Sequence, residues 1–274
     1  MASADSMTVA SQPPCSVVQL ARRWVVDYFN RHDASAAREF VAPDYALRIG
    51  EYTFAGRDAQ WLPAVKKQMD LFPGLGMTVH QVLAGTDQVA VWFSQHGVAA
   101  GGRVACWSGV AIYQSNGKQL TGCVAQEDYM TRQRQLKSGV GDPLDAPTPA
   151  PWDTVPLPPD LQAEAVVRQW LSQSWPLADA AVRCDDEYLT GLALDFQVQA
   201  SDITVLFSSG ADVAFHARQN GLYRGGLAGL PASSLPAVLH VNGIVRVQDG
   251  RVCGGRVIRD RAGVRAALLQ AGAP

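Results

Sequence analysis

Two ionisable side chains, each at the end of a predicted strand, have the chemistry for acid–base catalysis. His96 ends the segment VAVWFSQH, and Asp128 ends the segment GCVAQEDY. General acid–base catalysis needs one group to remove a proton and one to return it, and burial can raise a carboxyl pKa towards the range that serves both steps. We therefore predict His96 and Asp128 as the catalytic residues. Two structural alternatives stay open, because Asp128 could cap a helix over MTRQRQL and His96 could belong to a turn beside Gly97.

The remaining acidic residues near strand ends are predicted to be solvated. Glu127 should point to the strand face opposite that of Asp128, because side chains alternate along a strand. The run Asp185-Asp186-Glu187 could form a carboxylate site, but a solvated acidic turn fits it better.

Aromatic residues are placed where a planar or unsaturated substrate could stack on them. They lie on the first predicted helix and on inward strand positions, and ordinary core packing is the alternative, favoured for Trp24. The predicted substrate-binding residues are Trp24, Tyr28, Tyr45, Trp61, Trp92, Trp107 and Tyr113.

Missing motifs exclude several kinds of site. The chain has no HxH, HExxH or CxxC pattern and no glycine loop with nucleotide-binding spacing, so we expect no metal and no cofactor. The five cysteines are odd in number and widely spread, which favours buried free thiols over disulfides. A net charge of −2 gives no positive field that would attract nucleic acid.

The hydrophobic fraction of 47% allows a sizeable core. No apolar run is long enough to cross a membrane, and the first residues do not resemble a signal peptide, so we expect a cytoplasmic protein.

The chain divides at a proline-rich segment. Seven of the 16 prolines lie in 138–160, which should run extended over the surface. We predict a disordered N-terminus over 1–14, one unit over 15–137 and a second over 161–274. The basic residues are mostly arginine, which is typical of a GC-rich bacterial genome.

The two units look like diverged copies. Each opens with an amphipathic helix that carries a central Trp, and each closes with a hairpin at Asn-Gly or Asp-Gly. Between them, QHGVAAGG and QNGLYRGG place one Gln and three Gly at identical spacing. The second copy is shorter, because most of a third helix and its flanking strand are missing.

In the first unit, apolar spacing and turn residues predict an α+β fold. Helices are expected over about 16–31, 34–41 and 58–71, with Asp33 as the N-cap of the second. Strands are expected over 45–50, 52–56, 76–84, 88–98, 103–115 and 119–129. The helices come early in the unit and a long antiparallel meander comes late, and this order argues against a parallel sheet.

This order, with these segments, resembles the nuclear transport factor 2-like superfamily and, within it, the SnoaL-like (polyketide cyclase-like) group. The resemblance rests on the opening from Trp24 to Asp33 followed by AAREFVAPDYAL, on FPGLGMTVHQVLAGTDQVAVWFSQHG, and on the closing NGKQLTGCVAQEDYMTRQRQL. It implies a cone-shaped α+β barrel, in which a curved sheet wraps around helices and encloses an apolar pocket. It also implies that Asp128 matches the Asp that acts as general acid/base in SnoaL-like cyclases, with His96 assisting.

Related chemistries fit the residues less well. A ketosteroid isomerase-like site needs a Tyr where this chain has Val25, an Asp where it has Leu47, Arg48 or Ile49, and a protonated acid near Gly109. An epoxide hydrolase-like site could use Asp128 and Arg103, but a second inward acid is not evident. A dehydratase-like site could draw its histidines from His80 and His96.

We therefore predict a cofactor-free isomerase, cyclase or dehydratase acting on a hydrophobic carbonyl or polyketide-like molecule. A non-catalytic module that binds a ligand or a protein is the alternative, and an epoxide hydrolase is a further one. Aligned by the hairpin glycines, Asp128 falls opposite Arg261, so the second unit should lack the acid–base pair. The two units are expected to pack sheet to sheet as a pseudo-dimer within one chain, which should make the protein a monomer.

Overall fold

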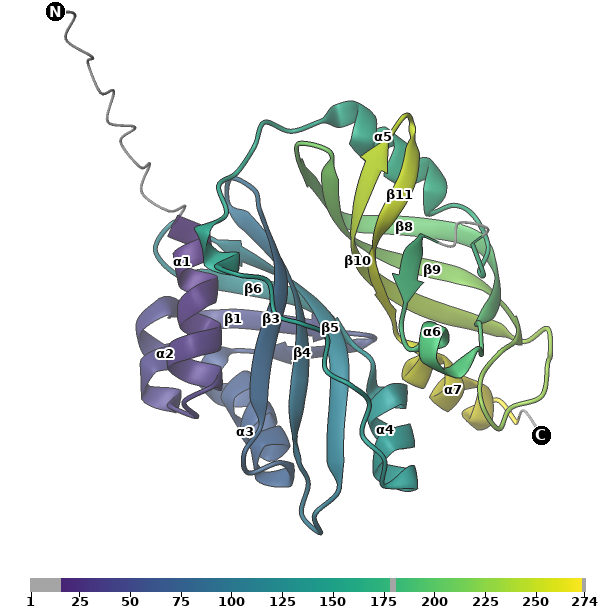
Figure 1. Cartoon of the computed structure of the whole chain (residues 1–274), viewed down its shortest axis with the longest axis horizontal. Helices are drawn as coiled ribbons and strands as arrows, with labels where there is room; N and C mark the ends of the chain where they lie inside the picture. The colour runs from purple at the N-terminus through teal and green to yellow at the C-terminus, as the bar shows by residue number, and fades with distance from the viewer. Residues whose placement is uncertain (1–15, 178–180, 273–274) are drawn as a thin grey trace, which may run out of the picture.

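The computed structural model describes residues 16–177 and 181–272, so the predicted disorder of 1–14 and the side chain of Cys15 lie outside the described residues. Two twisted β-sheets stand face to face, one from each half of the chain (Figure 1). Both sheets are accompanied by helices. The predicted α+β class is confirmed.

The first unit opens with helix α1 (Ser16–Arg23), which continues as a π-helical turn η1 (Trp24–Phe29), and with helix α2 (Ala34–Phe40). Asp33 caps α2 as predicted, because its carboxylate accepts a hydrogen bond from Ser35 N at 2.9 Å. The elements that follow are β1 (Val41–Ile49), β2 (Tyr52–Ala55), η2 (Arg57–Trp61), α3 (Leu62–Leu71), β3 (Gly76–Ala84), β4 (Gln88–Val98), β5 (Val104–Ser115), β6 (Leu120–Glu127) and α4 (Tyr129–Ser138).

The first sheet has the strand order β2-β1-β6-β5-β4-β3. Its neighbours are antiparallel except for β1 and β6, which are parallel. β3 and β4 match the predicted strands, whereas β1 begins at Val41, earlier than predicted. Helices α1–α3 pack on one face of this curved sheet, and that face holds the core of the unit (Figure 1).

The second unit repeats this arrangement in shortened form. Its elements are α5 (Leu161–Trp170), β7 (Val182–Cys184), α6 (Glu187–Thr190), β8 (Asp195–Ser209), β9 (Asp212–Gly225), β10 (Pro236–Gln248), β11 (Arg251–Arg259) and α7 (Arg261–Gln270). The strand order is β7-β11-β10-β9-β8, and β7 runs parallel to β11 as β1 does to β6. Within the described residues no strand corresponds to β2, and the one-turn helix α6 stands where the first unit has η2 and α3.

The faces of the two sheets that are turned away from their own helices pack on each other. This contact is apolar and joins side chains of both units: Leu83, Ala90, Val110, Ile112, Val124, Val205, Ala214, Ile244 and Ile258. Asn242 adds two hydrogen bonds across it, from its side-chain amide to the carbonyls of Val110 and Val124, each at 3.0 Å. The predicted sheet-to-sheet packing is therefore confirmed, and strands in the middle of the molecule are buried on both faces.

The proline-rich segment runs over the surface and is fastened to both units. Its one helical element is the 3-10 turn η3 (Pro151–Asp153). Near its middle the Ala146 carbonyl lies 3.0 Å from Nδ1 of His80, and at its end Asp160 N donates to Ser208 Oγ at 2.8 Å. Hydrogen bonds to both sheets hold it against them.

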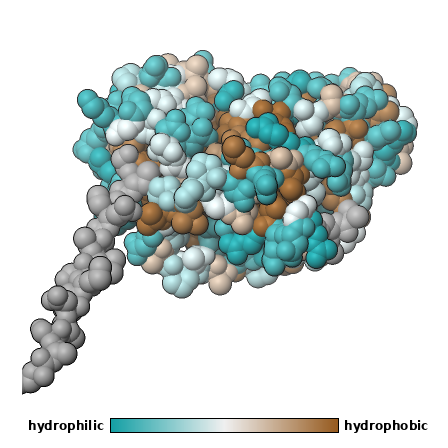
Figure 2. Space-filling view, turned by 90° about the horizontal axis from the view of Figure 1, so that it is seen from above, coloured by the Kyte–Doolittle hydropathy of each residue, from teal (hydrophilic) through white to brown (hydrophobic). Residues whose placement is uncertain are grey.

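On the face shown in Figure 2, polar side chains surround apolar ones. The apolar side chains gather near the middle of this face. Large apolar side chains that are exposed in the proline-rich segment and at the start of α5 include Leu157 and Leu161. Across the described residues, we find no helix with the length and apolar character needed to cross a membrane.

Candidate active site

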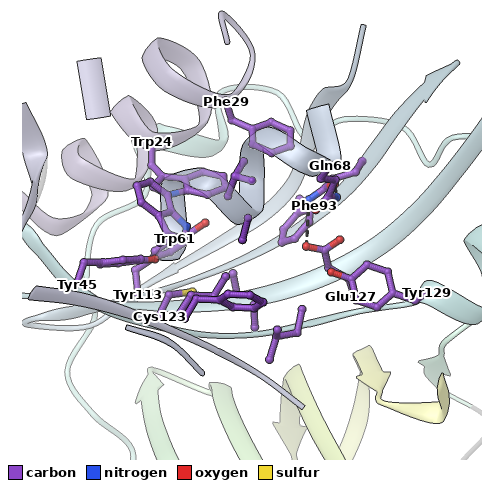
Figure 3. Close-up of a pocket in the computed structure, with 18 residues that line it drawn as sticks. Trp24, Phe29, Tyr45, Trp61, Gln68, Phe93, Tyr113, Cys123, Glu127 and Tyr129 are labelled. Carbon is purple, nitrogen blue, oxygen red and sulfur yellow. Dashed lines mark hydrogen bonds between the residues drawn. The ribbon is translucent and has the colours of Figure 1, made fainter. Parts of the chain in front are cut away.

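A cavity of about 110 Å³ lies inside the first unit, between the curved sheet and its helices. One end, the aromatic end, is formed by Trp24, Tyr45, Trp61 and Tyr113. The other end, the polar end, is formed by Gln68, Gln95, Glu127 and Tyr129. Figure 3 shows Trp24, Trp61, Tyr45 and Tyr113 grouped on one side, and Glu127 with Gln68, Phe93 and Tyr129 on the other. The cavity is therefore chemically asymmetric.

Strand alternation explains how the polar end is built. Phe93 and Gln95 on β4 line the cavity, as do Ala125 and Glu127 on β6, so these two strands turn odd-numbered side chains inwards. β4 and β6 flank β5, in which Gly109 pairs with Phe93 on one side and with Glu127 on the other. The Phe93 ring occupies the space above Gly109 that a Cβ atom would need. A side chain at position 109 would therefore clash with the cavity wall.

Glu127 is the acid that faces the cavity, so the prediction that it is solvated is wrong. Trp107 Nε1 donates to its Oε2 at 2.8 Å, and Gln95 Nε2 donates to its Oε1 at 3.1 Å. Gln68 Nε2 in turn donates to Gln95 Oε1, which fixes the amide orientation of both glutamines. Glu127 is thus held by neutral donors, and no ion pair binds it among the residues that the structure describes.

Burial raises the pKa of Glu127 above its ordinary value of 4.5, because the charged form loses hydration. The hydrogen bond from Trp107 and the charge of Arg132 oppose that rise. The Arg132 guanidinium lies 4.4 Å from the Tyr129 ring centroid and 5.1 Å from that of Trp107. A carboxyl group with a raised pKa and neutral hydrogen-bond partners can both accept and return a proton.

The aromatic end is a close-packed cluster. The ring centroids of Trp61 lie 5.0 Å from Tyr45 and 6.3 Å from Trp24, and those of Trp24 and Tyr113 are 5.5 Å apart. Cys123 also lines the cavity, but burial raises the pKa of its thiol to about 12, so it is protonated at neutral pH and is no nucleophile.

The predicted pairing of His96 with Asp128 is wrong. Both lie one residue away from inward positions, on the opposite strand face from Gln95 and Glu127, and neither lines the cavity. His96 Nε2 is 3.0 Å from Thr78 Oγ1.

Asp128 has two structural roles instead. It is the N-cap of α4, where it accepts a hydrogen bond from Thr131 N at 3.1 Å. It also forms a buried ion pair at 2.7 Å with Arg261 of the second unit. The structural alternative that the sequence left open therefore describes this residue.

The structure brings four of the seven predicted aromatic residues to the cavity, namely Trp24, Tyr45, Trp61 and Tyr113. Tyr28 packs behind Trp61, with ring centroids 5.2 Å apart, and Trp107 lies in a second layer behind Glu127. Trp92 is placed wrongly by the prediction: it packs in the layer between the two sheets and donates to Ser108 Oγ at 2.9 Å.

Sequence reasoning missed the polar end. The alternation of side chains along each strand was the signal that could have found it. On one strand it leads from Val91 and Phe93 to Gln95, and on the other from Cys123 and Ala125 to Glu127. Two other expected participants have structural contacts. Arg103 Nη1 donates to the Lys137 carbonyl at 3.0 Å, near the end of α4, and His80 Nε2 is 2.9 Å from Ser94 Oγ.

At the strand position that corresponds to Glu127, the second unit has an ion-paired side chain. Val241 pairs with Arg259 there, and Asp260 N donates to the His240 carbonyl as Asp128 N donates to that of Ser108. Arg259 thus stands at the place of Glu127 and Asp260 at the place of Asp128. The predicted alignment of Asp128 with Arg261 is wrong by one residue, because the closing hairpins differ in register.

Arg259 is fully buried and bonded on several sides. It forms an ion pair with Asp185 at 2.7 Å and another with Glu187, and its guanidinium lies 4.7 Å from the Trp175 ring centroid. The Asp185-Asp186-Glu187 run is therefore no solvated turn: Asp185 is entirely buried.

Comparison with known proteins finds one matching family model and several similar solved structures. The model of the SnoaL-like domain matches residues 21–122. No curated protein matches the chain. Among solved structures, IdmH of Streptomyces antibioticus, a proposed polyketide cyclase, is similar with 18% identity and a TM-score of 0.40, over 43% of this chain and 96% of its own.

Two further structures are similar over comparable lengths. A proposed SnoaL-like polyketide cyclase from Jannaschia sp. CCS1 has 16% identity and a TM-score of 0.41, over 47% of this chain and 96% of its own. AclR of Streptomyces galilaeus, a proposed hydroxylase, has 16% identity and a TM-score of 0.41, over 45% of this chain and 98% of its own.

Proposed function

We propose that the first unit, whose residues 21–122 match the model of the SnoaL-like domain, is a cofactor-free enzyme of the cyclase or isomerase type, with Glu127 as its general acid and base and a small hydrophobic carbonyl compound as substrate. One observation carries this proposal. A carboxylate with a raised pKa faces a mostly apolar cavity, and only neutral donors hold it.

The proposed reaction is a proton transfer through Glu127. Its carboxylate takes a proton from the carbon next to the substrate carbonyl. The C–H electron pair forms a C=C bond while the C=O π pair moves onto the oxygen, which gives an enolate. The protonated Glu127 then returns the same proton, either to another carbon, which is an isomerisation, or to the alkoxide formed when the enolate carbon attacks a second carbonyl, which is a ring closure. Neither outcome needs an oxidant or a reductant.

The neighbours of Glu127 support both halves of this cycle. Trp107 and Gln95 each donate one hydrogen bond to the carboxylate, which orients its two oxygens. Tyr129 lines the same end of the cavity, and its hydroxyl interacts with the Glu127 carboxylate. We propose that this hydroxyl turns to the enolate oxygen once Glu127 has taken the proton. The aromatic end excludes water, which strengthens these interactions.

The test is exchange of substrate hydrogen with solvent. The full chain is incubated in D₂O with cyclohex-2-enone, and deuterium incorporation is followed by NMR. Glu127→Gln should lower the exchange rate by about 10²–10⁴-fold, the usual contribution of a positioned acid or base. The matched control is Glu39→Gln, a change at an exposed carboxylate outside the cavity, and it should leave the rate unchanged.

The pH profile of the same exchange checks the proton assignment. The base is the ionised carboxylate, so the rate should rise with pH through a midpoint above 4.5, because burial raises the pKa of Glu127. An exchange rate in Glu127→Gln equal to that of the wild type would refute the proposal. Ligand binding without any exchange in the wild type would favour the non-catalytic module.

A further inference from the structure

We propose that the cavity accepts a single six-membered ring with one oxygen function, a monocyclic enone, enol or phenol, and excludes fused polycyclic ring systems. This inference rests on the proposed function for the choice of site and deepens it by naming the substrate class. The observations that carry it are the size of the cavity, the packing of its walls and the separation of its two ends.

Size sets the upper limit. The cavity measures about 110 Å³. An apolar cavity of about 150 Å³ in a protein core holds benzene, so a cavity of the present size is filled by one ring. A second fused ring would exceed this volume.

The walls have little freedom to give way. Trp24 stacks on Phe29 with ring centroids 5.3 Å apart, and Trp61 packs on both Tyr28 and Tyr45. Trp61 has no exposed surface at all, and the other side of the cavity is a hydrogen-bonded sheet. Protein interiors are packed as densely as organic crystals, so enlarging this cavity means displacing several rings together.

The two ends fix the orientation and the oxygen function. An apolar ring belongs against Trp24, Trp61 and Tyr113, where no charged side chain lines the wall. Its oxygen belongs at the polar end, beside Glu127 and Gln68 (Figure 3). A ligand without any oxygen would leave the polar end unpaired, and a ligand with charge at the ring end would be buried without a partner.

A titration series of ring number tests the size limit. Phenol, 2-naphthol and 2-hydroxyanthracene share one hydroxyl group and differ by one fused ring each, and each is titrated calorimetrically into the full chain. We expect phenol to bind at least about tenfold more tightly than 2-naphthol, and 2-hydroxyanthracene not to bind. Equal or tighter binding of the two-ring or three-ring compound would overturn the inference. So would tight binding of benzene at the affinity of phenol, since it lacks the oxygen.

An enlarged cavity should reverse the order. Trp61→Ala removes an indole from the cavity wall, and 2-naphthol should then bind at least as tightly as phenol. Phe54→Ala, at a half-buried position of the same wall, is the milder variant if Trp61→Ala does not fold. The matched control is Trp170→Ala, which removes a buried indole of the second unit that does not line this cavity, and the ring preference should stay unchanged.

Binding and catalysis fail separately in this design. Glu127→Gln should keep the preference for one ring, because the amide has the same shape as the carboxylate. If that variant also keeps hydrogen exchange with D₂O, the proposed function is wrong although the size limit stands. If the wild type exchanges hydrogen but prefers 2-naphthol, the size limit is wrong although the function stands.

Discussion

The interiors of the two units differ most at one strand position. In the first unit that position holds Glu127, which faces a cavity and is bonded by neutral donors. In the second it holds Arg259, which is paired with Asp185 and Glu187. The surrounding strands have the same order in both units, so a shared scaffold carries an ionisable group that is free to react in one and an ion pair in the other.

The loss of covering elements accompanies this difference. In the first unit η2 and α3 supply Trp61 and Gln68 to the cavity. The second unit has α6 in their place. Asp185, just before α6, has a left-handed φ of 43°, and its side chain points into the interior of the second unit. The first unit has Gly50 at this position, with a φ of 54°. A shorter segment thus pairs its own acidic side chains with Arg259, and what remains is a structural partner for the first unit.

The strongest test of this contrast is to remove the positive charge from the interior of the second unit. Arg259→Met leaves Asp185 and Glu187 buried without their partner, so we expect a loss of about 3–5 kcal/mol in the free energy of unfolding, measured by urea denaturation. The control is Arg246→Met on the same sheet, where the guanidinium is largely exposed and pairs with Asp212, and it should cost at most about 1 kcal/mol. A loss in Arg259→Met no greater than in the control would contradict the structural role.

The two helix caps give a matched pair of smaller effect. Asn caps helices as well as Asp does, so Asp128→Asn loses the ion pair with Arg261 but keeps the cap, and should cost about 1–3 kcal/mol in unfolding free energy. Asp260→Asn keeps the cap of α7 and should change stability by less than about 0.5 kcal/mol, because burial raises the pKa of Asp260 and disfavours its charge. Both variants should retain hydrogen exchange with cyclohex-2-enone, and its loss in Asp128→Asn alone would return Asp128 to the reaction.

The sheet faces that pack on the other unit differ as well, and this difference predicts an effect of pH on stability. Trp92 pairs with Val110 on β5, whereas His216 pairs with Asn242 at the corresponding place of the second unit. Burial, and next the nearby His240, hold the pKa of His216 at about 3, below its ordinary 6.5. In the unfolded chain His216 therefore binds a proton below pH 6.5, whereas in the folded chain it binds one only below about pH 3. Stability falls as the pH drops through this window.

At pH 5.5 this single group should cost up to about 1.4 kcal/mol of unfolding free energy relative to a neutral replacement. Urea denaturation at pH 7.5 and pH 5.5 measures it, and His216→Gln should show the smaller drop between the two. His32→Gln, an exposed histidine of the first unit, serves as the control and should follow the wild type. An identical drop in wild type and His216→Gln would show that His216 titrates normally.

Local sequence predicted the elements of the first unit closely. Turn residues, the Asp33 cap and apolar spacing placed β3 and β4 at their observed bounds, since each signal acts over a few neighbouring residues. The duplication pattern and the apolar strands also predicted that the sheets meet face to face. The choice of acid failed, because it required knowing which face of β6 borders the cavity.

The sequence by itself therefore determined the helices, the strands and their hairpins, since these depend on local hydrogen bonding and on spacing along the chain. The tertiary structure decided which side of each strand faces the cavity. From Ala105 to Tyr113, β5 is buried without interruption, because one face borders the interior and the other packs on the second unit. Where both faces are buried, the alternation of apolar and polar residues that would distinguish them disappears, and only the packed fold shows that Glu127 points inwards while Asp128 points to the partner sheet.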